Sequence, residues 1–501
     1  MNTLMEIKEE KETTLASAKL GYGFYNIIGG QRLAAVRKLS VINPATGKEL
    51  ATVPDIDRDG LERAISAARE AFPTWGSTPY RARKTVLIEM VHVIEQHMEE
   101  LSALLTSEHG HPAASAKWEI EWLTKLYGPA LHQMDLPDEK SEMGQVGHVV
   151  KRYLPLGVVC AISPWNLPVL LSFVKVLPAL LTGNTVVLKP SPFTPLTVLR
   201  IADYVNKLLP PGVLNVVTGG DDLGQWMTSH PAFDKISFTG STRIGKEILK
   251  STAATLKHVT LELGGNDAGI VLPDAQPEKI AEALFWSMYL LNGQACVGLK
   301  RLYVHEDLYA DLAGTLIAYA RQIKTGDGFE SESALGPIQN RAQYDRLRST
   351  LAEIEKSGTG ILYRGEIPQG TNGFFFPVIL LDNPPDDAPF VREEVFGPIR
   401  SLLKYKDVDE AIDRANNSSY GLGASVWGQD AEKADAVARR LQAGTVWINQ
   451  HANLHPNLPF NGFKDSGLGV EFGREGLEAF CKIQIVARKL LIEPALNCEL
   501  E

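Results

Sequence analysis

Apolar residues recur at helical spacing in the first third of the chain. Behind Asp57 they fall three or four residues apart, at Leu61, Ala64, Ile65, Ala68 and Phe72, which places them on one face of a helix. The Asp57 side chain can accept a hydrogen bond from the free N–H groups of a first helical turn. The pattern therefore predicts a helix that begins there, and a second helical stretch over about residues 81–105.

From about residue 156 the pattern changes to short apolar runs that alternate with helical stretches. The runs are GVVCAIS, NTVVLKP, VLNVVTG, KISFTGS and HVTLELGG. Such alternation is typical of βαβ units around a buried parallel sheet. A second alternating set, with AGIVL, KRLYVHE and GASVWG, extends over about residues 266–441. The sequence predicts an α/β fold whose domains pack closely, because no repeat, low-complexity tract or linker separates them.

Composition narrows the class of protein. Of the 501 residues, 44% are hydrophobic and 22% are charged, which is ordinary for a soluble globular protein. The net charge of −10 argues against nucleic acid or an anionic membrane as a partner. The most apolar region, residues 158–188, is interrupted by Pro164, Pro168, Lys175 and Pro178, so no stretch is long enough to span a bilayer.

The first residues and the cysteines favour a reducing compartment. The segment MNTLMEIKEEKETT is charged and is neither a signal peptide nor a transit peptide; residues 1–20 are expected to be weakly ordered. The cysteines are far apart and form no CxxC pair, so neither a zinc site nor a disulfide framework is indicated. They are Cys160, Cys296, Cys481 and Cys498. We expect a cytoplasmic protein.

The stretch LLNGQACVGLKR places Cys296 shortly after a helical apolar run. A free cysteine usually packs as a small hydrophobe. The alternative is a nucleophile, and the neighbours of Cys296 in the sequence do not decide between the two. The histidines are less informative: His109 and His111 in EHGHP lack a third metal ligand at a standard spacing, so no metal is expected, and His451 and His455 lie in a predicted loop at a possible pocket mouth.

The segment FTGSTRIGKE joins a predicted strand to a predicted helix. Gly240 and Gly245 would let the backbone approach a phosphate at the helix N-terminus. GSTRIGK also matches part of a nucleoside-triphosphate loop, but Glu247 replaces the hydroxyl residue that binds Mg²⁺ and would repel phosphate. The dinucleotide fingerprint GxGxxG is absent. Taken alone, the segment is a strand, a turn and a helix.

Several polar side chains follow predicted strands or lie in rigid turns. Asn166, between the prolines of PWNLP, is a candidate oxyanion donor or a turn residue bonded to its own backbone. Lys189, at the carboxyl end of a strand, is a candidate ligand for ribose or phosphate or a solvated lysine. Glu262 in TLELGG is a candidate general base or an exposed acid. In EEVFGP, Glu394 could accept hydrogen bonds from a ribose and Phe396 could pack on a ring. Alternatively, they are a loop glutamate and a core phenylalanine.

Nine motifs, taken together and in order, resemble one family. PWNLP, VVLKPS, FTGSTRIGK, LELGG, GQAC, EEVFGP, YGLGASVW, GTVWIN and PFNGFKDSGLG are similar to motifs of the NAD(P)-dependent aldehyde dehydrogenase superfamily and span about residues 42–482. The resemblance implies an aldehyde dehydrogenase-like α/β fold, with a Rossmann-type cofactor domain, an α/β catalytic domain and a small β oligomerisation element. It also implies oxidation of an aldehyde to its carboxylic acid by a homo-oligomer, either a dimer or a tetramer.

The resemblance also implies a role for each matching residue. Cys296 matches the family's nucleophile, Glu262 its general base and Asn166 its oxyanion-stabilising asparagine. Lys175 and Glu471 match positions associated with proton relay or structural support. The positions that match cofactor contacts are Lys189, Gly240, Ser241, Gly245, Glu394 and Phe396, with Trp165 counted among them.

These residues have a consistent chemistry. A free thiol has a pKa of about 8.5, so Cys296 needs a base or a positive field to become a nucleophilic thiolate. Attack on the aldehyde carbon gives a thiohemiacetal alkoxide, which Asn166 and the Cys296 backbone N–H would stabilise. Loss of hydride to the nicotinamide leaves a thioester. Glu262 then activates water to hydrolyse it; members that pass the acyl group to coenzyme A tend to lack this glutamate.

The sequence departs from the family at the position that selects the cofactor. Many NAD-using members read KPSE or KPAE, and that glutamate binds the adenosine ribose. Here Pro192 stands in its place, and a proline neither bonds the 2′-hydroxyl nor repels a 2′-phosphate. NAD is expected, with NADP as the alternative.

The expected substrate pocket is mostly aliphatic. Its residues are Leu167, Val174, Leu291, Leu454 and Phe460. Succinate-semialdehyde members carry an arginine where Val174 stands, as a carboxylate clamp, and betaine-aldehyde members line this region with aromatics for a quaternary ammonium. Neither feature is evident. An uncharged aliphatic or aromatic aldehyde is the expected substrate.

The expected domains follow from the two strand sets and the resemblance. The cofactor domain comprises residues 1–131 and 152–262, with 442–477 returning to it, and the catalytic domain residues 263–441. The oligomerisation element combines residues 132–151 and 478–501; its last strand, QIVARKLL, would be an unpaired edge in a monomer.

Two rival functions are weighed against the dehydrogenase. The first is a catalytically inert dinucleotide-binding structural protein, since fold does not imply function. The intact set of Cys296, Glu262 and Asn166 argues against it. The second is a nucleoside triphosphatase that uses GSTRIGKE, and Glu247 argues against that.

Overall fold

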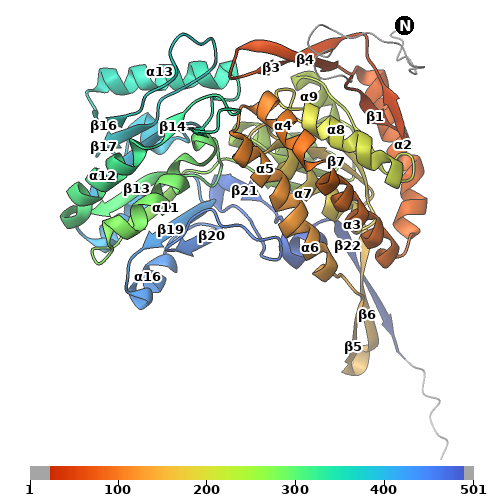
Figure 1. Cartoon of the computed structure of the whole chain (residues 1–501). Coiled ribbons are helices and arrows are strands. Elements are labelled where there is room, and N and C mark those ends of the chain that lie inside the picture. The colour runs from red at the N-terminus through yellow and green to blue at the C-terminus, as the bar shows by residue number, and fades with distance from the viewer. Residues whose placement is uncertain (1–22, 490–501) are drawn as a thin grey trace, which may run out of the picture.

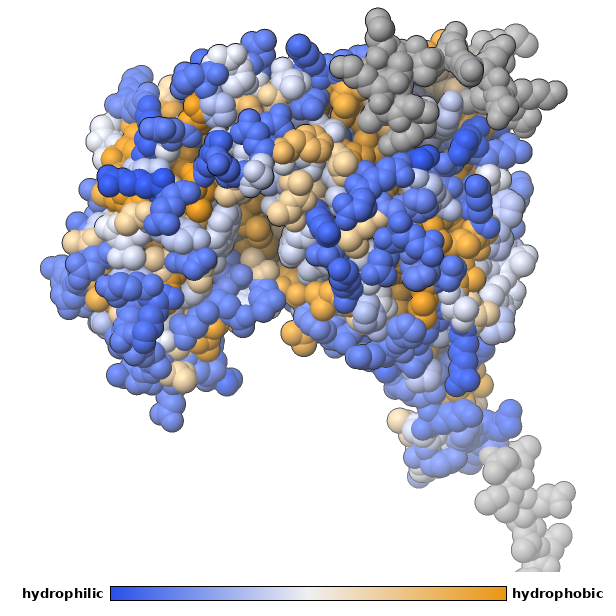
Figure 2. Space-filling model, viewed as in Figure 1, coloured by the Kyte–Doolittle hydropathy of each residue, from blue (hydrophilic) through white to orange (hydrophobic). Residues whose placement is uncertain are grey.

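The computed structural model describes residues 23–489. Three parts of the sequence discussed above lie outside this range: residues 1–20, which we expect to be weakly ordered, Cys498, and the last two residues of QIVARKLL. Two large lobes, each built around one sheet, lie side by side, and a small third sheet projects from one of them (Figure 1). The surface is hollowed between the lobes (Figure 2). Within residues 23–489, no helix combines the length and the apolar character needed to cross a membrane.

The first lobe contains an eight-stranded sheet in the order β2-β1-β9-β8-β7-β10-β11-β21. The five strands from β9 to β11 in this order are parallel, and they are the five runs that the sequence predicts, so the predicted parallel sheet is confirmed. Every residue of β7, β8 and β10 is buried, as expected for strands covered on both faces. The strands are β1 (Asn26–Ile28), β2 (Gln31–Leu33), β7 (Val158–Ile162), β8 (Thr185–Lys189), β9 (Leu214–Val216), β10 (Lys235–Thr239), β11 (His258–Glu262) and β21 (Gly467–Leu468).

Helices cover this sheet in two layers. Helices α2, α7 and α9 pack on the strands, and α3 and α4 lie outside α7 and α8. The predicted start of α2 is confirmed, because the Asp57 side chain accepts a hydrogen bond from the Gly60 N–H at 2.9 Å. The helices are α2 (Arg58–Ser77), α3 (Tyr80–Gln96), α4 (Met98–His109), α5 (Ala113–Glu121), α6 (Gly128–Gln133), α7 (Pro168–Leu181), α8 (Leu196–Val205), α9 (Asp221–Ser229) and α10 (Thr242–Thr252).

The helical stretch predicted over residues 81–105 is two helices. The chain leaves the helical conformation at His97, between α3 and α4. The two helices pack on different partners, α3 on α6 and α7 and α4 on α5 and α8. A straight helix would not follow both sets of partners, and the apolar periodicity continues across the break, so the sequence pattern does not reveal it.

The second lobe contains a seven-stranded sheet in the order β16-β17-β18-β13-β12-β19-β20. All neighbouring strands are parallel except β16 with β17. The strands are β12 (Asp267–Val271), β13 (Leu299–His305), β16 (Gly360–Arg364), β17 (Ile379–Asp382), β18 (Ile399–Tyr405), β19 (Gly423–Trp427) and β20 (Thr445–Ile448). Its helices are α11 (Pro277–Tyr289), α12 (Glu306–Ala320), α13 (Arg341–Ser357), α14 (Pro389–Arg392), α15 (Val408–Asn416) and α16 (Ala431–Ala438).

The chain passes back from the second sheet to the first near its end. Strand β20 pairs with β19 and lies beyond residue 441, where we expect the catalytic domain to end. Farther along, β21 pairs with β11 of the first sheet, and α17 (Gly473–Glu478) packs on α7. Residues 442–477 thus contribute to both lobes.

The third sheet has three antiparallel strands in the order β22-β6-β5. Its strands are β5 (Glu139–Met143), β6 (Gly147–Pro155) and β22 (Cys481–Arg488). All eight residues of β22 pair with β6. Within the described residues, β22 has no second neighbour, and Ile483 and Ile485 on it are 58% and 57% exposed. The remaining strands form two two-stranded ladders. They are β3 (Lys38–Asn43) with β4 (Lys48–Pro54), and β14 (Lys324–Thr325) with β15 (Ser333–Leu335).

Candidate active site

Cys296 lies in a tight loop between α11 and β13. After α11 the chain makes one short turn in which Leu291, Asn292 and Gly293 adopt left-handed backbone angles, with φ of 54°, 55° and 73°. Such angles are costly for leucine and persist only where the surrounding structure holds them. Cys296 follows three residues later and is half-buried.

Arg400 is the residue that holds this turn, and sequence reasoning missed it. It is a fully buried residue of β18. Its guanidinium donates hydrogen bonds to the carbonyl oxygens of Met288 at 2.7 Å, Gly293 at 3.0 Å and Gly397 at 2.7 Å. A fork of fixed donors suits several carbonyls at once. Gly293 is required here because a Cβ would lie 2.2 Å from the Gly397 carbonyl oxygen.

Glu262 ends β11 and points at the same loop. It is 5% exposed, and apart from the Cys296 thiol neither carboxyl oxygen has a hydrogen-bond partner among the described residues. Burial, with the charge of Glu471 behind it, raises the pKa of Glu262 to about 8. A carboxyl group with this pKa exchanges protons near neutral pH, which suits a general base.

Asn166 joins the turn after β7 to the nucleophile loop. It is buried, and its Nδ2 donates a hydrogen bond to the Gln294 carbonyl oxygen at 3.0 Å. An amide nitrogen carries two hydrogens, so one remains for a further acceptor near Cys296. The structure brings together the three residues that the family resemblance links, Asn166, Glu262 and Cys296, from β7, β11 and the loop before β13.

The environment of Cys296 opposes formation of its thiolate. Burial and the neighbouring Glu262 carboxyl raise the pKa of the thiol, whereas the charge of Lys300 lowers it. In this structure the thiol therefore retains its proton at neutral pH. A base that accepts the proton as attack proceeds is the arrangement that activates such a nucleophile.

Lys175 and Glu471 form a buried ion pair close to Glu262. Lys175 lies on α7 with no exposed surface, and its Nζ donates to the Glu471 carboxylate and to Thr239 Oγ1, each at 2.6 Å. Because the charge of Lys175 lowers the pKa of Glu262 while that of Glu471 raises it, the pair acts on the carboxyl electrostatically. A role of this pair in proton relay or structural support stays a prediction.

The candidate cofactor residues of the first lobe lie at the carboxyl ends of its parallel strands. Lys189 ends β8 and is 5% exposed; burial lowers the pKa of its ammonium to about 8, and no carboxylate among the described residues lies within ion-pair distance. Gly240 and Ser241 connect β10 to α10, and Ser241 caps that helix. A Cβ on Gly245 would lie 2.4 Å from Leu263 Cδ2, so glycine lets α10 approach the end of β11.

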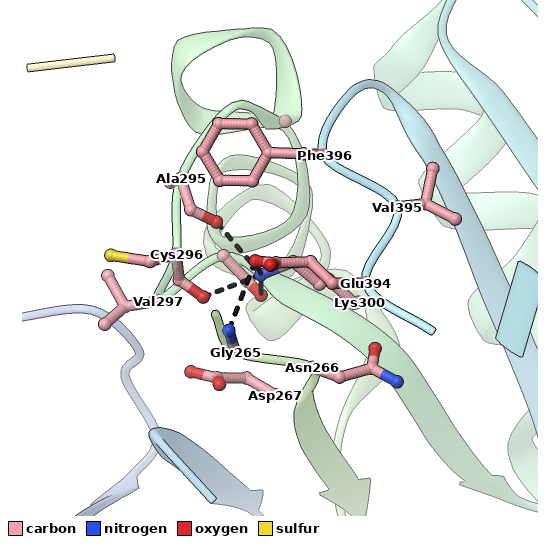
Figure 3. Close-up of polar contacts among 12 residues, drawn as sticks. Gly265, Asn266, Asp267, Ala295, Cys296, Val297, Lys300, Glu394, Val395 and Phe396 are labelled. Atoms are coloured by element: carbon pink, nitrogen blue, oxygen red, sulfur yellow. Dashed lines mark hydrogen bonds and ion pairs between the residues drawn. The ribbon is translucent and has the colours of Figure 1, made fainter. Parts of the chain in front are cut away.

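The candidate cofactor residues of the second lobe face this edge. The ring centroids of Trp165 and Phe396 are 5.3 Å apart, edge to face. The Glu394 carboxylate lies 3.3 Å from Lys300 Nζ and accepts a hydrogen bond from the Gly265 N–H at 3.2 Å (Figure 3). A carboxylate and two rings from opposite lobes thus lie near the loop that carries Cys296.

Most of the expected pocket residues belong to, or pack against, the same large apolar cluster that Cys296 contacts. Val174 and Phe460 belong to a buried apolar cluster, and Leu167, Leu454 and Cys296 pack against it. The same cluster contains Phe472 and Tyr127, which sequence reasoning missed, and Trp122 packs on it. Leu291 is buried but lies in the left-handed turn and is not part of this cluster.

The histidines separate into two groups. His109 and His111 are buried with ring centroids 3.3 Å apart, and burial lowers the pKa of His109 to about 3. Within residues 23–489 no cluster of three metal-ligating side chains occurs. His451 supports the nucleophile loop, since its Nε2 donates to the Val297 carbonyl oxygen at 2.8 Å and lies 3.5 Å from the Asp267 carboxylate, whereas His455 is exposed.

Comparison with known proteins agrees with this arrangement. A sequence model of the Aldehyde dehydrogenase family matches residues 32–486. The phenylacetaldehyde dehydrogenase of Pseudomonas fluorescens is 38% identical over 474 residues, covering 91% of this chain and 93% of that protein. Aldehyde dehydrogenase LUC3 of a Fusarium species is 37% identical over 466 residues, covering 92% and 98%. The betaine aldehyde dehydrogenase of Staphylococcus aureus, solved in complex with NAD⁺, has a TM-score of 0.91 at 30% identity and covers 95% of this chain and 98% of that chain. The predicted family and fold are confirmed: this chain belongs to the aldehyde dehydrogenase family.

Proposed function

We propose that this enzyme oxidises an uncharged aliphatic or aromatic aldehyde to its carboxylic acid, with Cys296 as nucleophile, Glu262 as general base and Asn166 as oxyanion donor. One observation carries the assignment. A half-buried thiol faces a buried carboxyl group with a pKa of about 8, and the Asn166 amide is bonded to the same loop. A structural cysteine would need neither partner.

The catalytic residues act in consecutive steps. Glu262 accepts the thiol proton as Cys296 Sγ bonds to the aldehyde carbon, and the amide of Asn166 with the Cys296 backbone N–H stabilises the alkoxide that forms. Bound NAD⁺ supplies the acceptor for the hydride that leaves this carbon. Glu262 releases this first proton to solvent and then takes a proton from water, whose oxygen attacks the Cys296 thioester. The products are the carboxylate, the reduced nicotinamide and the free thiol, with two protons released.

NAD⁺ is the cofactor we propose, and the residues fit it. Lys189 is a buried ammonium without a carboxylate partner among the described residues, so a polyhydroxylated or anionic ligand would satisfy it. The β10–α10 turn suits a phosphate, and Glu394 with Phe396 suits the ribose and ring. The Staphylococcus aureus relative in complex with NAD⁺ supports this choice. NADP⁺ is the alternative, because Pro192 is not an acidic selector.

The substrate class rests on the lining of the pocket. Leu167, Val174 and Phe460 share with Cys296 one large apolar cluster, and their side chains offer no partner for a charged group on the substrate. The relative named phenylacetaldehyde dehydrogenase supports the aromatic part of this class.

The assembly, the domains and the location are part of the proposal. Among residues 23–489 no second strand pairs with β22, and this edge with its exposed isoleucines suits pairing with a second copy of the chain. We retain a cofactor domain, a catalytic domain and an oligomerisation element, with β20 placed in the catalytic domain. A cytoplasmic location stays a prediction.

The test is reduction of NAD⁺ and of NADP⁺, in separate wells, by purified protein and a panel of aliphatic, aromatic, ω-carboxy and amino aldehydes. We expect turnover with apolar aldehydes and its loss in Cys296→Ala. A protein that binds NAD⁺ stoichiometrically and reduces it with none of them is the inert binding protein, the rival function. Preference for an ω-carboxy aldehyde would overturn the substrate class alone.

A further inference from the structure

Lys300 is a buried cation four residues after the nucleophile Cys296. It is the second residue of β13 and is 4% exposed. Its Nζ donates hydrogen bonds to the carbonyl oxygens of Cys296 at 2.6 Å, Ala295 at 3.0 Å and Gly298 at 3.3 Å. The Glu394 carboxylate lies 3.3 Å from the same Nζ (Figure 3).

This arrangement curls the nucleophile loop around one ammonium group. An ammonium has three hydrogens to donate, and here four oxygens surround it, so it binds the loop at several points at once. Hydrogen bonds from a charged donor are stronger than neutral ones. With the Cys296 carbonyl held, the orientation of its peptide, and therefore of the thiol, is restricted.

The same ammonium holds the carboxylate of Glu394. That carboxylate is bound from two sides, by Lys300 and by the Gly265 N–H. Gly265 also lies against the loop, since a Cβ on it would be 2.6 Å from the Cys296 carbonyl oxygen. Lys300 thus lies between the two parts of the site, one that carries the nucleophile and one that faces the cofactor.

We propose that Lys300 is a positioning residue that couples the nucleophile loop to Glu394, so that the thiol and the cofactor-binding carboxylate are held in register. The inference rests on the proposed function, in which Glu394 binds the cofactor. It predicts that Lys300 sets both the reactivity of Cys296 and the affinity for NAD⁺, although it is a ligand of neither.

The charges around the thiol determine the direction in which each variant should shift its pKa. Glu262 and Glu394 raise the pKa of Cys296, and Lys300 lowers it. Lys175 faces Glu262, and His451 binds the neighbouring Val297 carbonyl. Loss of the Lys300 charge should therefore raise the thiol pKa, and loss of the Glu394 charge should lower it.

The experiment measures alkylation of Cys296 by iodoacetamide against pH, without cofactor, by mass spectrometry of the peptide that contains it. Lys300→Met should move the midpoint upward by about one pH unit, in line with the effect of a neighbouring charge, and slow alkylation about tenfold at neutral pH. Glu394→Gln should move it downward. NAD⁺ binding, followed by titration calorimetry, should weaken severalfold in Lys300→Met.

A matched control is Lys257→Met. Lys257 is another buried lysine whose Nζ donates to a backbone carbonyl, that of Thr228, but it precedes β11 at the end far from Glu262. It should leave both readouts unchanged. Lys300→Gln keeps two donors without the charge and should shift the midpoint as Lys300→Met does, which preserves the test if the methionine variant does not fold.

Opposite shifts in the lysine and glutamate variants distinguish positioning from general structural damage. Equal shifts of the same sign, or an unchanged midpoint with unchanged NAD⁺ affinity, would overturn the inference. Because alkylation needs no aldehyde, the test remains valid if the wild type proves inactive on every aldehyde, an outcome that would remove the proposed function and not this coupling.

Discussion

Replacement of Glu262 by glutamine tests the electrostatics of the site most directly. The carboxyl group is buried and its pKa is raised from about 4.5 to about 8. For an acid whose folded pKa is raised, the folded chain keeps a proton that the unfolded chain releases. Folding stability therefore falls as pH rises between about 4.5 and 8, and a glutamine, which does not titrate, is free of this cost.

The size of the effect follows from the shift. One pKa unit corresponds to about 1.4 kcal/mol. At pH 7, about 2.5 units above the unfolded pKa, Glu262→Gln should be more stable than the wild type by about 3 kcal/mol. The difference should shrink to nearly zero near pH 4.5 and approach about 5 kcal/mol above pH 8.

The assay is urea unfolding at fixed protein concentration, at several pH values from 5 to 8.5. The exposed Glu247→Gln, on the outer face of α10, is the control and should give a difference that does not vary with pH. In parallel, the variant should reduce NAD⁺ about 10²–10⁴-fold more slowly, because a general base contributes about that much. A stability difference independent of pH would refute the reasoning, since the Glu262 carboxyl would then be ionised at little cost.

Three other variants test separate parts of the structure. Asn166→Ala removes the amide that binds the Gln294 carbonyl and should lower kcat/KM by about 10²–10³-fold in steady-state assays; a loss below threefold would contradict the oxyanion role. Gly265→Ala places a Cβ 2.6 Å from the Cys296 carbonyl oxygen, so it should cost about 1–3 kcal/mol in urea unfolding and slow Cys296 alkylation. Ile485→Asp on β22 should halve the mass measured by sedimentation, whereas Val36→Asp, at another exposed apolar residue, should not; an unchanged mass in both would locate the contact between subunits elsewhere.

The sequence by itself determined the elements whose pattern is local. The five buried runs that form β7 to β11 and the Asp57 cap of α2 follow from residues close together in the chain, and the structure has them where they are predicted. The residues alone left Cys296, Glu262 and Asn166 each with an ordinary structural explanation. Only their resemblance to one family, nine motifs in order, grouped them into a site.

Tertiary structure decided what depends on contacts between distant segments. The end of α3 at His97, the place of β20 in the second sheet and the approach of Glu262 to Cys296 arise when separate elements pack together. Arg400 and Lys300 are the clearest cases, because both are cations within apolar strands and both bind backbone carbonyls. Every residue has such a carbonyl, so the partners carry no signal in the sequence, and a buried charge becomes recognisable only once the fold has brought those oxygens around it.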